Sequence, residues 1–206
     1  MRFATQKDTT ASKFFKQKGI LTVEHLDMNY LADIFRLEIQ YVKFKSKVLY
    51  RDSFTIMALT EGNSIIETRR TFFHELSHHF NHYGSQNKMD TSFRDLQESQ
   101  ARWLSLYYAM PLHIFEPLLI KYKDPKYLAE LFELPIDMIL ERCETIKRER
   151  SRSEQYDVHR RKEFVHRVKS KSLQPGKVHN GTLSILNQLK NQVGKERMSN
   201  DVTRLL

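Results

Sequence analysis

The chain has 206 residues, of which 40% are hydrophobic and 29% charged. This length is ample for one medium domain with an appendage, or for two small domains. Its single cysteine, Cys143, excludes an intramolecular disulfide framework and a four-cysteine metal site. No apolar run reaches the roughly 18 residues of a membrane span, and the sequence starts without the apolar segment of a secretory signal. We therefore expect a cytoplasmic protein that makes no membrane contact.

The formal charge of +9 belongs to the C-terminal third of the chain. Residues 145–206 hold 15 Lys and Arg against 6 Asp and Glu, whereas residues 1–144 hold equal numbers of both signs. The most basic stretch, 145–172, favours contact with nucleic acid or another polyanion, and a solvated helix of alternating charge is the alternative. We expect a basic C-terminal tail over 151–206.

The first part of the neutral region mixes helical and strand patterns. Residues 1–20 are polar and rich in lysine, as in an N-terminal arm or a short helix. Apolar residues at three- and four-residue spacing predict an amphipathic helix over 24–38. Partly alternating β-formers predict two or three short strands over 39–59.

The rest of the neutral region is predicted to be helical. A long helix begins near Glu67, and another runs over 92–110 with Ser92 as its N-cap and Asp95 three residues later, as in a capping box. Shorter helical segments are expected at 114–121, 125–132 and 135–148.

The helix that begins near Glu67 carries His-Glu-Leu-Ser-His at 74–78. His74 and His78 lie about 40° apart on one helix face, so both imidazoles can reach one Zn²⁺ at about 2.0–2.1 Å. Glu75 is placed to take a proton from a metal-bound water. A His-rich helix that is merely solvated is the alternative. The other side of the helix carries an apolar stripe, formed by Phe72, Leu76, Phe80 and Tyr83.

A hydrolytic zinc site commonly needs a third protein ligand and one open position. His82 lies roughly 12 Å along the helix from His74, which is too far for it to join both other histidines on one ion. Asp90 falls in an expected loop and stays a candidate. Asp95 has the competing capping role.

Glu98 is the strongest candidate for the third ligand. It lies outside the apolar face of the 92–110 helix, and Ala101 and Ser105 follow it one and two turns later. Small side chains there would let another helix approach closely. A surface glutamate paired with Arg94 or Arg102 is the alternative, and the residues alone leave both open.

Together these segments resemble the ImmA/IrrE family of zinc metallo-endopeptidases. That family shows a His-Glu-Leu-Gly-His helix that continues to another His, then a Glu-x-x-Ala helix that ends in a Met-Pro-like segment. Ser77 stands where the family usually has glycine. The resemblance covers about residues 20–148 and rests on the stretch 70–78, His82, the stretch 98–101 and Met110-Pro111.

The resemblance implies an α+β, zincin-like metalloprotease domain over 21–122, with a short β-sheet and the HExxH motif on its active-site helix. A small helical region over 123–150 would follow, and then the tail, so that the C-terminal region is mostly helical.

The same resemblance implies the parts of the active site. One Zn²⁺ per chain would be bound by His74, His78 and Glu98, and Glu75 would be the general base. The donor that stabilises the oxyanion is not assigned, and the candidates are His82, Tyr83, Tyr107 and Tyr108.

Characterised members of this family are cytosolic, site-specific proteases that cleave helix-turn-helix repressors of mobile elements or of stress-response genes. The resemblance therefore implies a protein substrate of that kind. One alternative is a nonproteolytic regulator that binds DNA or a repressor through the basic C-terminal region. Another is the toxin component of a two-gene module. The sequence indicates neither the scissile bond nor the activating signal nor the oligomeric state.

Overall fold

The computed structural model describes residues 5–51, 54–82, 90–170 and 174–206. The chain divides into two units, Met1–Arg150 and Ser151–Leu206. In the described part of the chain, no helix combines the length and the apolar character that crossing a membrane requires.

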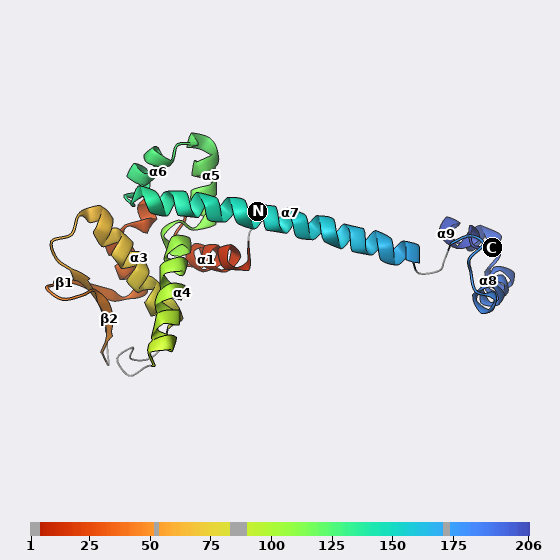
Figure 1. Ribbon diagram of the computed structural model, residues 1–206, viewed down its shortest axis with the longest axis horizontal. Helices are drawn as coiled ribbons and strands as arrows, with labels where there is room; N and C mark the ends of the chain where they lie inside the picture. The colour runs from red at the N-terminus through yellow and green to blue at the C-terminus, as the bar shows by residue number, and fades with distance from the viewer. Residues whose placement is uncertain (1–4, 52–53, 83–89, 171–173) are drawn as a thin grey trace. The chain divides into compact units, whose positions relative to one another are not determined.

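A small mixed sheet forms one layer of the first unit (Figure 1). Its strands are β1 (Leu37–Val42), β2 (Lys47–Tyr50) and β3 (Thr55–Thr60), in the order β1-β3-β2. β3 runs parallel to β1 and antiparallel to β2. The central strand is the most buried, with Ile56 to Leu59 shielded from solvent. The predicted short sheet and the α+β class are confirmed.

Helices form the remainder of the first unit. They are α1 (Gln6–Gln17), η1 (Glu24–Leu26), α2 (Met28–Phe35), α3 (Ile65–Asn81), α4 (Thr91–Ala109), α5 (Leu112–Tyr122), α6 (Pro125–Phe132) and the first part of α7 (Ile136–Ser170). α3 contacts the sheet on one side and α4 on another. This position makes α3 the element around which the unit is organised.

Three predicted helices have different bounds in the structure. The helix expected over 24–38 is divided into η1 and α2 and ends at Phe35, because Leu37 and Glu38 pair with β3 as part of β1. Asp90, not Ser92, is the N-cap of α4, because the Asp90 carboxylate accepts a hydrogen bond from the backbone N–H of Ser92 at 2.9 Å. α7 continues far beyond the expected end at residue 148. No glycine or proline lies between Pro135 and Pro175, so no residue of either type interrupts the helix there.

The segment expected as an N-terminal arm packs into the core of the first unit. Phe15 of α1 and the following Ile20 are fully buried. Asp8 of α1 forms a buried ion pair with Arg142 of α7, and Arg142 also donates to the carbonyl of Met110 at 3.2 Å. These contacts join α1, the end of α4 and the start of α7 in one unit.

The second unit has little buried surface. It consists of α7 from Ser151 onward, α8 (Asn180–Val193), η3 (Lys195–Arg197) and α9 (Asn200–Thr203). Val178 and Leu205 are its buried apolar residues among those described. Most of the other described side chains of this unit are exposed.

Candidate metal centre

Helix α3 presents two histidines on the side opposite its core contacts. Phe72, Phe73 and Leu76 are fully buried and anchor the helix. The side chain of His74 is 26% exposed and that of His78 is 9% exposed. The split between apolar and histidine faces that the sequence indicates is therefore present in the structure.

Ser77, which replaces the usual glycine, fits inside the helix. It is fully buried, and its hydroxyl donates to the carbonyl of Phe73 one turn earlier at 2.7 Å. This bond satisfies the buried hydroxyl, so the serine disturbs neither the helix nor the histidine face.

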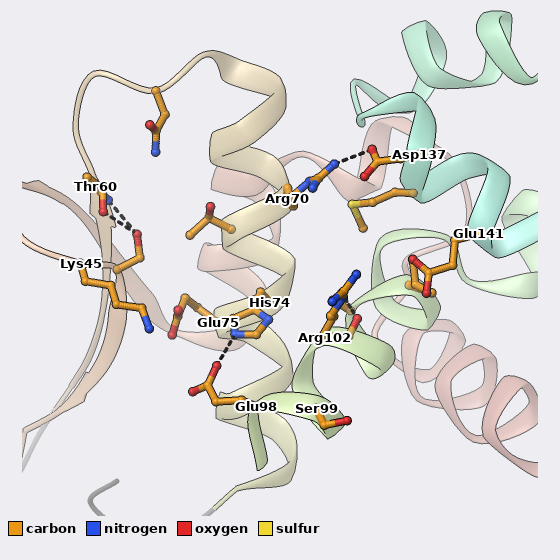
Figure 2. A pocket seen from close by; sticks show the side chains of 16 residues that line it. Lys45, Thr60, Arg70, His74, Glu75, Glu98, Ser99, Arg102, Asp137 and Glu141 are labelled. Atoms are coloured by element: carbon orange, nitrogen blue, oxygen red, sulfur yellow. Dashed lines mark hydrogen bonds and ion pairs between the residues drawn. The ribbon is translucent and has the colours of Figure 1, made fainter. Parts of the chain in front are cut away.

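Glu98 of α4 lies against both histidines (Figure 2). Its carboxylate oxygens are 3.2 Å from Nε2 of His74 and 3.4 Å from Nε2 of His78. The two Nε2 atoms are 3.2 Å apart. The structure thus brings Glu98 of α4 against His74 and His78 of α3, although Glu98 follows His74 by 24 residues in the sequence. Within the described residues, they form a group whose ligand atoms could hold one metal ion.

The spacing of these atoms fits a tetrahedral zinc site. Two ligands that each stand 2.0–2.1 Å from one ion, at the tetrahedral angle, are about 3.3 Å from one another. The Nε2 atoms of His74 and His78 are 3.2 Å apart, close to this value, and each faces a different oxygen of Glu98, Oε2 at 3.2 Å from His74 and Oε1 at 3.4 Å from His78. Two imidazoles and one carboxylate are also a donor set that Zn²⁺ accepts while keeping a fourth position open. The residues present therefore fit the ion.

Burial and mutual charge alter the pKa values of these groups. Burial, followed by the nearby His74, lowers the pKa of His78 to about 4, and burial also lowers the pKa of His74. Burial opposes the ionised form of Glu98, but the neighbouring histidines outweigh it and lower the pKa of this carboxyl. The site therefore favours neutral imidazoles and a carboxylate, the protonation states that bind metals.

Glu75 is the most shielded carboxyl of the centre. Its exposed fraction is 7%, and burial, with a smaller contribution from Glu98, raises its pKa to about 7. Lys45, in the loop before β2, opposes this rise. A carboxyl with a pKa near neutrality can both accept and return a proton, as a general acid–base group must.

A pocket of about 690 Å³ opens beside His74, Glu75 and Glu98. Figure 2 shows Lys45 extending toward the centre from the sheet side, while Arg102 comes from α4. Thr60 holds the loop that carries Lys45 to the end of β3. The backbone N–H of Thr60 donates to the Ser46 hydroxyl, and the Thr60 hydroxyl donates to the carbonyl of Phe44.

Charged residues of α3 and α7 line the far wall of the same pocket. Arg70 is paired with Asp137 there, and Glu141 lies one turn further along α7. Sequence reasoning did not identify Lys45, Asp137 or Glu141 as pocket residues. They carry no motif, and only the packing of the loop and α7 around α3 brings them to the site.

Four other candidates from the sequence, Tyr107, Tyr108, Asp90 and Asp95, are described by the structure and lie outside the pocket lining. Tyr107 donates to Glu149 at 2.6 Å, and Tyr108 exchanges hydrogen bonds with Asn81. Asp90 is the N-cap of α4, and Asp95 is exposed. Tyr83 lies outside the described residues.

His82 contacts the centre without facing the metal position. Its Nδ1 is 2.9 Å from Nδ1 of His78, and its Nε2 is 3.1 Å from Oε1 of Gln100. Both ring nitrogens therefore have protein partners. The role of Gln100 was not recognised from the sequence, although the residue lies within the Glu-x-x-Ala segment that carries the family resemblance.

Comparison with known proteins identifies a family and individual proteins that are similar to this chain. The family model described as IrrE N-terminal-like domain (Peptidase_M78) matches residues 18–144. The phage-like element PBSX protein XkdA of Bacillus subtilis (strain 168) is 29% identical over 93 residues, which are 45% of this chain and 47% of that protein. A solved structure of a Mycobacterium tuberculosis transcriptional regulator matches with a TM-score of 0.47 and 12% identity, over 66% of this chain and 46% of that one. The chain thus spans about half the length of each of these proteins.

Proposed function

Because this chain belongs to the IrrE N-terminal-like (Peptidase_M78) family, we propose that it is a zinc-dependent, site-specific endopeptidase of the cytoplasm. The observation that carries the proposal is the convergence of His74, His78 and Glu98 at separations that match a tetrahedral zinc site. The open pocket beside these groups supports it, since a peptide must reach them.

Each residue of the centre has a distinct part in the proposed reaction. His74, His78 and Glu98 would hold one Zn²⁺ per chain. When bound, the ion would lower the pKa of a water ligand and polarise the scissile carbonyl. Glu75 would accept the proton of the attacking water and return it to the leaving amine, and its shielded position beside His74 suits both steps.

We assign the substrate class to helix-turn-helix transcriptional repressors, whose cleavage would release genes of a mobile element or of a stress response. The similarity to a protein of a phage-like element supports the mobile-element context. The basic stretch 145–172 would add contact with nucleic acid, so that the protease meets its substrate on DNA.

The test compares the wild-type protein with Glu75→Gln, and uses Glu144→Gln as the control because Glu144 is an exposed glutamate elsewhere in the first unit. All three proteins should carry about one zinc ion per chain by elemental analysis. Wild type and Glu144→Gln should cleave a helix-turn-helix repressor encoded beside this gene, with one defined cut by mass spectrometry. Glu75→Gln should not.

Three outcomes would contradict the proposal. Normal cleavage by Glu75→Gln would mean that another group is the base. Release of the repressed genes in cells by Glu75→Gln, without any cleavage, would favour the nonproteolytic regulator. Growth arrest on expression of this chain alone would instead favour the toxin.

A further inference from the structure

The hydrogen bonds at the metal centre continue from His78 to the neighbouring helix. Nδ1 of His78 is 2.9 Å from Nδ1 of His82, and Nε2 of His82 is 3.1 Å from Oε1 of Gln100. Gln100 follows Glu98 by two residues on α4. The helices α3 and α4 are therefore linked twice at this point, once through Glu98 and once through this chain of three side chains.

With the Gln100 amide oxygen facing His82 and both imidazoles neutral, the end of the chain at Gln100 indicates where its protons lie. An amide oxygen only accepts, so Nε2 of His82 must carry the hydrogen of that bond. A neutral imidazole has one N–H, which leaves Nδ1 of His82 as an acceptor. His78 must then donate from its own Nδ1, and its Nε2 keeps a lone pair.

That lone pair points to the place where a metal ligand is needed. Nε2 of His78 is the atom that lies 3.2 Å from Nε2 of His74 and 3.4 Å from Glu98. We propose that His82 and Gln100 are positioning residues that keep His78 in the tautomer able to bind the ion through Nε2. The proposal rests on the zinc site proposed above and assigns roles to two residues that would not touch the ion.

The physical reason for such a pair is that a metal-binding histidine needs both a fixed ring orientation and a defined tautomer. In metal sites the second ring nitrogen commonly donates to a carboxylate or a carbonyl. Here a second histidine accepts that bond, and it can do so only while Gln100 holds its proton on the far nitrogen. Gln100 thus acts on His78 through His82.

The first test reads the tautomer directly in the zinc-free protein. Long-range ¹H–¹⁵N NMR near neutral pH should show Nδ1 of His78 as the protonated nitrogen and Nε2 as the unprotonated one. Protonation at Nε2 would overturn the proposal, because it would mean that the Gln100 amide donates and the whole chain is reversed. In Gln100→Leu, the preference of His78 for the Nδ1–H form should weaken.

The second test measures zinc affinity by competition with a chelator. Gln100→Leu should bind zinc about tenfold more weakly, a loss typical of outer-shell partners. Gln155→Leu makes the same change at an exposed helical glutamine of the second unit and should have no effect.

The decisive comparison uses His82→Ala as a background. If Gln100 acts only through His82, then adding Gln100→Leu to His82→Ala should cause no further loss of zinc affinity. A second tenfold loss in the double variant would overturn the proposed chain. If wild type binds no zinc, the proposed function fails, and the NMR measurement still decides whether His82 and Gln100 set the tautomer of His78.

Discussion

Two histidine–glutamate pairs in this chain have the same separation but different surroundings. Nε2 lies 3.2 Å from a carboxylate oxygen both in the pair His74–Glu98 and in the pair His159–Glu163. The first pair joins two helices, is 26% and 37% exposed, and has His78 beside it. The second is an i,i+4 pair on one helix, and its side chains are 72% and 67% exposed.

This contrast shows what turns a common ion pair into a candidate metal site. Among the described residues, a third donor and partial exclusion of water accompany the pair of the first unit, where helices pack on one another. Water competes for both side chains of the exposed pair His159–Glu163, so this pair contributes little. Two kinds of basic side chain show the same contrast: Arg142 of the first unit is fully buried against Asp8, whereas Arg152 and Arg160 of the second unit are exposed.

The largest expected effect is on zinc binding. His78→Ala removes one of three donors and should abolish the zinc that co-purifies with the chain, measured by elemental analysis. His159→Ala removes the exposed histidine of the second pair and should leave the stoichiometry near one. Loss of zinc in His159→Ala would show that the second unit also holds metal and would break the contrast.

Buried charge should matter far more than exposed charge for stability. Arg142→Met leaves Asp8 buried without its partner and should lower the free energy of unfolding by about 3–5 kcal/mol. Arg152→Met, at an exposed site, should change it by less than about 0.5 kcal/mol. Urea denaturation monitored by circular dichroism measures both values. Equal effects of the two substitutions would contradict the assignment of Arg142 to the core.

The close approach of α3 and α4 depends on small side chains. Ala101, one turn after Glu98, is fully buried, so Ala101→Leu should cost about 1–3 kcal/mol of stability by overpacking and should weaken zinc binding as α4 moves away. Ser184→Leu, at an exposed position of α8, should change neither quantity. Unchanged zinc affinity in a folded Ala101→Leu protein would refute this role of the helix packing.

The exposed charges of the second unit should govern binding to nucleic acid. Replacing Arg160, Arg161 and Lys162 by Gln should reduce the slope of log affinity against log salt by as much as about 2.7, if all three contact phosphates of duplex DNA. Replacing Lys121, Lys123 and Lys126 of the first unit should leave the slope unchanged. Fluorescence anisotropy over a salt series measures this slope. Equal slopes for both variants would contradict a role of the basic tail in binding DNA.

The smallest effect concerns a half-buried histidine of the first unit. Burial lowers the pKa of His113, whose Nε2 donates to the carbonyl of Ile20 and whose Nδ1 is buried without a partner among the described residues. Below a pH of about 6.5 the unfolded chain therefore binds more protons at this site than the folded chain does. The free energy of unfolding should decrease as the pH is lowered through this range. His113→Gln keeps a donor but does not titrate, so its stability should decline less over this interval. An identical decline in both proteins would exclude His113 as a contributor.

Local patterns predicted much of the fold and half of the candidate centre. The spacing of His74 and His78 against a buried stripe identified α3 and its active face, and the bounds of α6 agree with the structure. The predicted N-cap of α4, Ser92, was wrong. Asp90 and Ser92 are both residue types that suit an N-cap, and the sequence does not show at which of them the helix begins. The length of α7 was underestimated because an apolar period is lacking beyond residue 148, although the helix continues.

From the sequence alone, the chemistry of one helix face and the segregation of charge were determined, since both follow from the order of residues along the chain. Whether Glu98 meets the two histidines or remains a surface glutamate was decided only by the packing of α4 on α3. So were the burial of Glu75, the position of Lys45 and the bond from His82 to Gln100. The physical reason is that helical periodicity acts over a few residues, whereas distances between helices depend on side chains that are remote in sequence and on the water they exclude.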